Sequence, residues 1–236
     1  MEQATSSWKA GAAKICIAMR AHPRRAMDGE AGYWVPARWM VENREAALVL
    51  ALICHRKLFG EVYLGLQPDY FWEMPHDSGV LCCPFIATSK VAPYAIRPGD
   101  IDLLIVPYER DELILERIVA CEVKIVRASF ANQGRSPNDF GRSQASASVE
   151  LGFPYVALVH LVVSDASPKS AWRRSWALKM AEDDRVIPLG TRLKDLLPSD
   201  LIRRAYGRLV ANADDDLGLA AVYAGRRPPA TSPILS

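Results

Sequence analysis

The chain has 236 residues, enough for one well-buried core or for a core with a small appendage. Half of the residues are apolar and 24% are charged, a balance that is typical of folded proteins and argues against disorder throughout. With 29 basic and 27 acidic residues the net charge is only +2, which excludes a strong overall field toward nucleic acid or membranes. Any basic surface must therefore be local.

The cysteines and the apolar runs together predict where the protein resides. The chain has five cysteines, an odd number with no C-x-x-C spacing, which indicates free thiols in a reducing compartment. Residues 46–54 are far too few to span a bilayer, and residues 15–19 are too few for the core of an export signal. We therefore expect a cytoplasmic protein without a membrane partner.

The N-terminal part of the chain predicts an irregular lead-in followed by a helix. Residues 1–36 carry proline and glycine turn signals without steady periodicity, so we expect an N-terminal extension. Residues 42–57 begin with acidic and end with basic side chains, which favours a helix because both ends match its dipole. Short apolar runs at 61–66 and 80–86, separated by prolines, predict strands and turns.

The middle of the chain predicts a strand pair, a helix and a further strand. Residues 101–106 and 113–126 are rich in strand-forming residues, and the polar segment between them has hairpin length, which indicates an antiparallel pair. Ser136 is followed by a proline and an early acid, so a helix is expected over 137–151. Residues 155–163 predict the next strand.

The C-terminal part, residues 166–236, is expected to be a helical extension. Helices are predicted at 171–181 and 200–213, and the tail 226–236 is rich in proline and small residues, which favours flexibility. Basic residues of this region could form a surface that tracks a phosphate backbone, or an ordinary solvated face. The residues concerned are Lys169, Arg173, Arg174, Lys179, Arg203, Arg204 and Arg208.

Charged residues interrupt two of the apolar strands. Because side chains alternate along a strand, Glu122 and Lys124 project from the same face. Their neighbours are apolar, and burying an unpaired charge is costly unless a partner compensates it. A divalent ion held by Asp102, Glu122 and a backbone carbonyl would compensate them, since Mg²⁺ and Mn²⁺ prefer hard oxygen ligands. Lys124 could then position a water for attack on a phosphodiester bond.

The segments Gly99-Asp-Ile-Asp102-Leu-Leu and Glu122-Val-Lys124 resemble the signature of the PD-(D/E)XK, or restriction-endonuclease-like, nuclease superfamily. The resemblance implies an α/β fold with an αβββαβ core over residues 37–165, in which helices flank a mixed central sheet. It also implies a Mg²⁺-dependent DNA endonuclease of the restriction, repair or defence type, with Asp102 and Glu122 as metal ligands and Lys124 as a catalytic group. By the same resemblance, Gln144 on the following helix would assist the site, and Glu45 could match an acid on the first helix.

Several alternatives stay open at this stage. Asp100 lies on the same strand face as Asp102 and competes with it for the metal. The chain could be a catalytically inactive, nuclease-derived module that binds nucleic acid or a partner, or a structural protein in which Glu122 and Lys124 form a plain ion pair. His160, within an apolar strand, is more typical of a hydrogen-bonded core histidine. The substrate could be DNA or RNA, and a homodimer would suit cleavage of both strands of a duplex.

Overall fold

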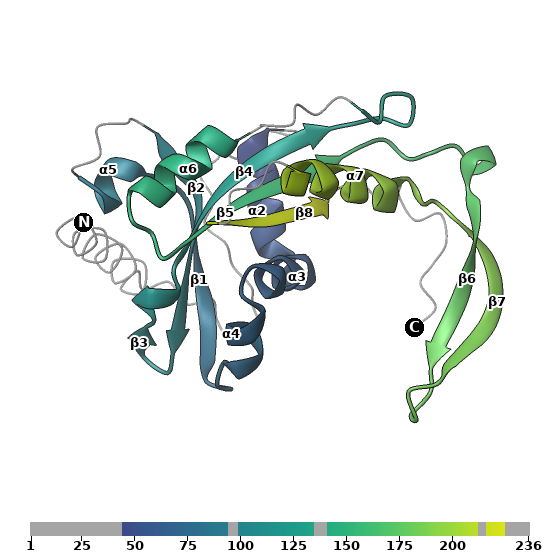
Figure 1. Cartoon of the computed structure of the whole chain (residues 1–236), viewed down its shortest axis with the longest axis horizontal. Helices are drawn as coiled ribbons and strands as arrows, with labels where there is room; N and C mark the ends of the chain where they lie inside the picture. Colours follow the sequence, from purple (N-terminus) through teal and green to yellow (C-terminus); the bar gives the residue numbers. More distant parts are fainter. Residues whose placement is uncertain (1–43, 94–98, 135–140, 212–215, 225–236) are drawn as a thin grey trace, which may run out of the picture.

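The computed structural model describes residues 44–93, 99–134, 141–211 and 216–224, and a mixed sheet lies at its centre (Figure 1). The strands follow the order β1-β2-β4-β5-β8, and β3 pairs with β2. The pairs β1/β2 and β2/β4 are antiparallel, whereas β4/β5 and β5/β8 are parallel. The strands are β1 (Ser78–Ala87), β2 (Asp100–Glu109), β3 (Glu112–Leu113), β4 (Val119–Arg127), β5 (Tyr155–Val163) and β8 (Leu217–Tyr223).

Helices cover both faces of this sheet. On one face, α2 (Glu45–Cys54), α3 (Arg56–Leu66) and α4 (Pro68–Glu73) bury Val49, Phe59 and Tyr70 against the odd-numbered residues of β4 and β5. On the other, Ala145 of α6 (Arg142–Glu150) and Leu201 of α7 (Leu197–Ala211) pack against even-numbered residues of the same strands. The short α5 (Thr88–Val91) follows β1. The expected α/β class, a mixed central sheet flanked by helices, is confirmed.

The helices α6 and α7 explain why the sheet becomes parallel. A parallel pair needs a crossover connection, and α6 supplies it between β4 and β5 while α7 precedes β8. Because both faces of β4 and β5 are covered, these strands are apolar along most of their length. Glu122 and Lys124 of β4 and His160 of β5 are the polar side chains on the α6/α7 face of these two strands.

The predicted helix 42–57 is confirmed over its described part but is broken at His55. The chain ends α2 at Cys54 and starts α3 at Arg56, and the Nδ1 atom of His55 accepts a hydrogen bond from the N–H of Leu58 (3.2 Å). The helix α3 then continues through 61–66, so the strand expected there is wrong. Residues 59, 62 and 63 are all buried, which is the spacing of a helix. The apolar run taken from the sequence began at residue 61, so it left out residue 59 and with it this spacing.

The strands expected at 80–86, 101–106 and 155–163 are confirmed, and so is the antiparallel arrangement of β2 and β4. The expected run 113–126 is interrupted by a 3-10 turn, η2 (Leu115–Arg117), before β4 begins. The helix expected over 137–151 is described from Arg142 to Glu150, preceded by Gly141 in a left-handed conformation. The proposed cap at Ser136 lies outside the described residues.

The expectation of a helical C-terminal extension is wrong in two places. The residues of the helix predicted at 171–181 form β6 (Arg173–Met180), which pairs with β7 (Val186–Lys194) in a separate hairpin, after a 3-10 turn, η3 (Lys169–Ala171). Alternation of Trp176, Leu178 and Met180 with smaller or basic residues has the period of a strand. In addition, β8 joins the central sheet beside β5.

The remaining C-terminal expectation, a helix at 200–213, corresponds to α7. The extension 1–36 and the tail 226–236 lie outside the described residues. Within the described ranges, no helix combines the length and the apolar character that crossing a membrane requires.

Candidate active site

The candidate site lies where β2 and β4 stop pairing with each other. Their ladder runs from Ile105 and Val119 to Leu103 and Cys121 and ends there, although β2 continues beside β1 and β4 continues beside β5. Beyond this point the backbone N–H of Val123 donates to Oδ2 of Asp102 at 2.8 Å. If β2 and β4 continued to pair, the N–H of Val123 would donate to a backbone carbonyl of β2. Here it donates to the Asp102 side chain, which connects the end of β2 to β4.

Glu122 and Lys124 form an ion pair on the same face, between the Lys124 Nζ and the Glu122 Oε1. Their side chains are only 8% and 14% exposed, so both charges are largely removed from water. The predicted alternation along β4 is confirmed, because Val119, Cys121 and Val123 pack against the helices on the opposite face. Asp102, Glu122 and Lys124 thus meet at one place, as the sequence predicted.

Burial dominates the electrostatics of the two carboxyl groups at the centre. It raises the pKa of Glu122 from 4.5 to about 7, and the negative charge of Asp102 adds to this rise while Lys124 opposes it. Burial also raises the pKa of Asp102, against the opposing effects of the Val123 N–H and the charge of Lys124. Both carboxylates would therefore be stabilised by additional positive charge.

The cation of the site responds in the opposite sense. Burial by itself would lower the pKa of Lys124, but the hydrogen bond to Glu122 and the charges of Glu122, Asp102 and Glu45 outweigh burial and raise it. Lys124 therefore stays protonated at neutral pH and does not act as a general base in this state. Its chemical use is that of a fixed positive charge and hydrogen-bond donor.

The structure also brings Glu45 into the electrostatic surroundings of the site. Glu45 is the first residue of α2, and burial followed by the charge of Asp102 raises its pKa, while Lys124 and Arg127 lower it. Asp100 lies exposed at the start of β2 and its charge contributes to the raised pKa of Asp102. Burial and the bond to β4 therefore place Asp102 at the cluster with Glu122 and Lys124, whereas Asp100 lies at the exposed start of the strand.

Gln144 lies in the first turn of α6, and its side chain is exposed. In the described part of the chain it makes no side-chain hydrogen bond to Asp102, Glu122 or Lys124. The structure therefore places Gln144 on the helix that covers the site but does not join it to the cluster, and its assisting role stays a prediction.

Two residues at the site were not identified from sequence spacing. Gly141, at a φ of +93°, lies so close to Lys124 that a Cβ atom there would be 2.7 Å from the Lys124 Cγ and from the Leu158 Cδ1. His160 is 1% exposed and is the register partner of Lys124 on the parallel strand β5. The register of β4 and β5 and the docking of α6 determine both neighbours, and neither follows from local pattern.

The carboxylates of Asp102 and Glu122 fit a magnesium ion that takes its other ligands from water or substrate. Within the described ranges, no three His, Cys, Asp or Glu side chains form a ready-made cage for a metal. Mg²⁺, however, commonly binds through one or two carboxylates and keeps waters or substrate phosphates as its other ligands. Asp102 and Glu122, two adjacent carboxylates whose ionised forms are disfavoured by burial, match that requirement.

Several arginines lie around a narrow crevice near the C-terminal end of β4. Arg127 of β4 and Arg204 and Arg208 of α7 line it together with Gln133. Arg204 donates to the Gln133 side chain at 2.8 Å, and Arg208 donates to the carbonyl oxygen of Gly134 at 3.3 Å. These contacts connect α7 to the loop that follows β4 and concentrate positive charge beside the strand that carries Glu122 and Lys124.

Comparison with protein-family models, with curated proteins and with solved structures found no match.

Proposed function

We propose that the protein is a Mg²⁺-dependent nuclease of the PD-(D/E)XK type, an endonuclease that hydrolyses phosphodiester bonds in DNA. The observation that carries the proposal is the convergence of Asp102, Glu122 and Lys124 on one sheet face at the point where β2 and β4 separate. The order of α2, β1, β2, β4, α6 and β5 supports it, since it follows the αβββαβ pattern of that superfamily.

In this proposal Asp102 and Glu122 hold the metal ion, and Mn²⁺ could replace Mg²⁺. The bound ion would neutralise charge on the phosphate and lower the pKa of a water molecule. Lys124 orients the attacking water by donating a hydrogen bond and stabilises the negative charge that develops on the phosphate. Gln144 would assist at the edge of the site. Because the pKa of Glu122 is about 7, this ligand is only about half ionised at neutral pH in the free protein and becomes fully ionised at higher pH.

A polyanionic substrate is supported by the local distribution of charge. The chain is nearly neutral overall, so long-range attraction to DNA is weak. Arg127, Arg204 and Arg208 lie around a narrow crevice near the end of β4, and their positive charge would attract phosphates that flank the scissile bond. This arrangement favours a substrate that reaches past the site along the strand.

The first experiment compares the wild-type protein with Lys124→Ala on supercoiled plasmid and on single-stranded DNA, with Mg²⁺, Mn²⁺ or chelator at low salt. Loss of a single transition-state donor should reduce cleavage by roughly 100- to 1000-fold. Lys57→Ala, on the exposed surface of α3, is the matched control and should cleave like the wild type. Equal activity of Lys124→Ala and Lys57→Ala, or metal-independent cleavage, would contradict the proposal.

A second candidate function is a nuclease-derived module that binds nucleic acid without cleaving it. The observation in its favour is the direct ion pair of Glu122 and Lys124, which gives each of these two charges a partner without a metal. This module would retain DNA at low salt but would show neither cleavage nor stabilisation by Mg²⁺. A purely structural protein would show none of these three properties. Thermal unfolding with and without Mg²⁺ and the cleavage assay separate the nuclease from the other two possibilities, and DNA retention at low salt separates the binding module from the structural protein.

A further inference from the structure

The β6–β7 hairpin forms a sheet of its own. Its two strands pair only with each other and stand away from the central sheet and its helices (Figure 1). An isolated two-stranded hairpin is marginally stable in water and gains stability when one of its faces is covered. The exposed state of this hairpin is therefore the feature that calls for a physical explanation.

The two faces of the hairpin differ in character. Cross-strand partners share a face, so the register assigns Arg174, Trp176, Leu178 and Met180 with their partners on β7 to one side. The side chains of Trp176, Leu178 and Met180 are 65%, 59% and 65% exposed. This side is the apolar face, formed by Trp176, Leu178, Met180, Val186, Pro188 and Leu193. The opposite side carries Arg173, Lys179, Arg192 and Lys194.

Charge also changes along the length of the hairpin. Its base, where the chain enters β6 and leaves β7, is basic through Arg173, Arg174, Arg192 and Lys194. Its tip is acidic, because Glu182, Asp183 and Asp184 form the turn, and only Asp183 has an ion-pair partner there, Arg185. The hairpin is thus basic at its base and acidic at its tip, and on the apolar face the basic charge of the base is Arg174, so this face is complementary to a reversed copy of itself.

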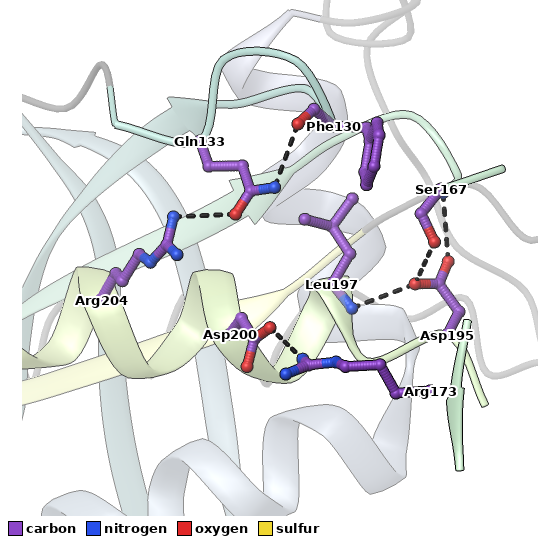
Figure 2. A network of polar contacts seen from close by, with 8 residues as sticks. All are labelled: Phe130, Gln133, Ser167, Arg173, Asp195, Leu197, Asp200 and Arg204. Atoms are coloured by element: carbon purple, nitrogen blue, oxygen red, sulfur yellow. Dashed lines mark hydrogen bonds and ion pairs between the residues drawn. The ribbon is translucent and has the colours of Figure 1, made fainter. Parts of the chain in front are cut away.

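Polar contacts hold the base of the hairpin against the body of the protein (Figure 2). Asp195, which follows β7, accepts hydrogen bonds from the Ser167 hydroxyl at 2.6 Å, from the Ser167 N–H at 3.2 Å and from the Leu197 N–H at 3.0 Å. Arg173 at the start of β6 forms an ion pair with Asp200 of α7. Both strand ends at the base of the hairpin are therefore fixed to α7, which lowers the conformational entropy lost when the hairpin binds a partner.

We propose that the apolar face of the β6–β7 hairpin binds the same face of a second copy of this chain. The two hairpins pack antiparallel about a two-fold axis, so that the apolar faces cover each other and each acidic tip lies beside the other copy's basic base. A two-fold contact requires a self-complementary surface, and the distribution of charge along the hairpin meets that condition. Exposed Trp, Met and Arg side chains on one surface are also characteristic of interface cores.

Two other arrangements fit the hairpin less well. Insertion into a DNA groove would bring Glu182, Asp183 and Asp184 close to phosphates, which repel them. Edge-to-edge strand addition on β7 is hindered because Pro188 lacks a backbone N–H and the register shifts by one residue next to it. Face-to-face packing needs neither edge, and it removes the exposed apolar side chains from water.

The test measures the oligomeric state of the full chain by sedimentation equilibrium, in chelator and without nucleic acid. The wild type should show a monomer–dimer equilibrium. The double variant Leu178→Ser/Met180→Ser should raise the dimer dissociation constant roughly a hundredfold. Ile187→Ser, which makes the same kind of change on the basic face, is the matched control and should dimerise like the wild type. Because the hairpin lies outside the core clusters, all variants should keep the wild-type circular dichroism spectrum.

A charge exchange tests the antiparallel orientation. Arg174→Glu should weaken the dimer, and adding Glu182→Lys/Asp184→Lys to that variant should restore it, because Arg174 is the charge of the base on the apolar face and this charge and the tip charges are then reversed together. A wild type that is monomeric at every concentration would overturn the proposal. A dimer unaffected by Leu178→Ser/Met180→Ser, or weakened equally by Ile187→Ser, would also overturn it. Failure of the charge exchange to restore the dimer would refute the antiparallel contact. None of these outcomes depends on nuclease activity.

Discussion

Replacing Glu122 by glutamine should stabilise the protein at alkaline pH. The pKa of Glu122 is about 7 in the folded chain against 4.5 for an ordinary glutamate, chiefly because the carboxyl group is buried. Between these values the folded state keeps a proton that the unfolded state has released, so the free energy of unfolding falls as the pH rises from 4.5 to about 7. Above that range the loss is constant at about 3 kcal/mol, since each pKa unit corresponds to about 1.4 kcal/mol.

Glutamine resembles the protonated form of Glu122 and cannot ionise, so the variant escapes this loss. Urea unfolding in chelator should show that Glu122→Gln is more stable than the wild type by under about 1 kcal/mol near pH 5 and by about 3 kcal/mol near pH 8. Glu73→Gln, at an exposed position of α4, controls for the removal of one negative charge and should show little difference at either pH.

A Glu122→Gln variant that is less stable than the wild type near pH 8 would contradict this expectation. That result would mean that Lys124 compensates the buried carboxylate fully, so that the site needs no further cation in its resting state. Addition of Mg²⁺ extends the test, because a bound ion should recover stability in the wild type and leave Glu122→Gln unchanged.

Three further substitutions probe the neighbours of the site. Asp102→Ala leaves the Val123 N–H without its acceptor and should lower the unfolding free energy by about 1–3 kcal/mol, whereas Asp102→Asn, which keeps an acceptor oxygen, should abolish metal-dependent stabilisation at a smaller cost. Gly141→Ala places a Cβ against Lys124 in left-handed backbone, so thermal unfolding should show a loss of about 1–3 kcal/mol together with weaker cleavage. Asp195→Ala removes acceptors at the start of α7 and should cost about 0.5–2 kcal/mol in urea unfolding.

Each of these expectations has its own contradicting result. Equal stability of Asp102→Ala and Asp102→Asn would show that the bond to β4 contributes nothing. A Gly141→Ala protein with wild-type stability and cleavage would mean that the added Cβ atom does not displace the Lys124 side chain. Asp183→Ala at the exposed hairpin tip is the control for Asp195→Ala. An equal loss of stability in both variants would mean that the hydrogen bonds of Asp195 do not stabilise the start of α7.

Local patterns determined a large part of this protein from its sequence. Alternation along a strand is a property of the backbone itself, so the common face of Glu122 and Lys124 could be predicted without any knowledge of the fold. Strands at 80–86, 101–106 and 155–163 were likewise predictable, because their apolar runs are bounded by turn residues. The meeting of Asp102 with these two residues followed once the strands were taken as neighbours.

The rest depended on contacts between segments far apart in the chain. A short apolar run such as 61–66 fits a helix or a strand, and only its packing against the sheet selects the helix. Residues 173–180 became a strand because 186–194 lie beside them, and β8 entered the sheet because its partner β5 was already in place. The end of the β2–β4 ladder and the approach of Gly141 to Lys124 are also tertiary. The sequence therefore determined which residues carry charge on which face, whereas long-range packing decided what surrounds them.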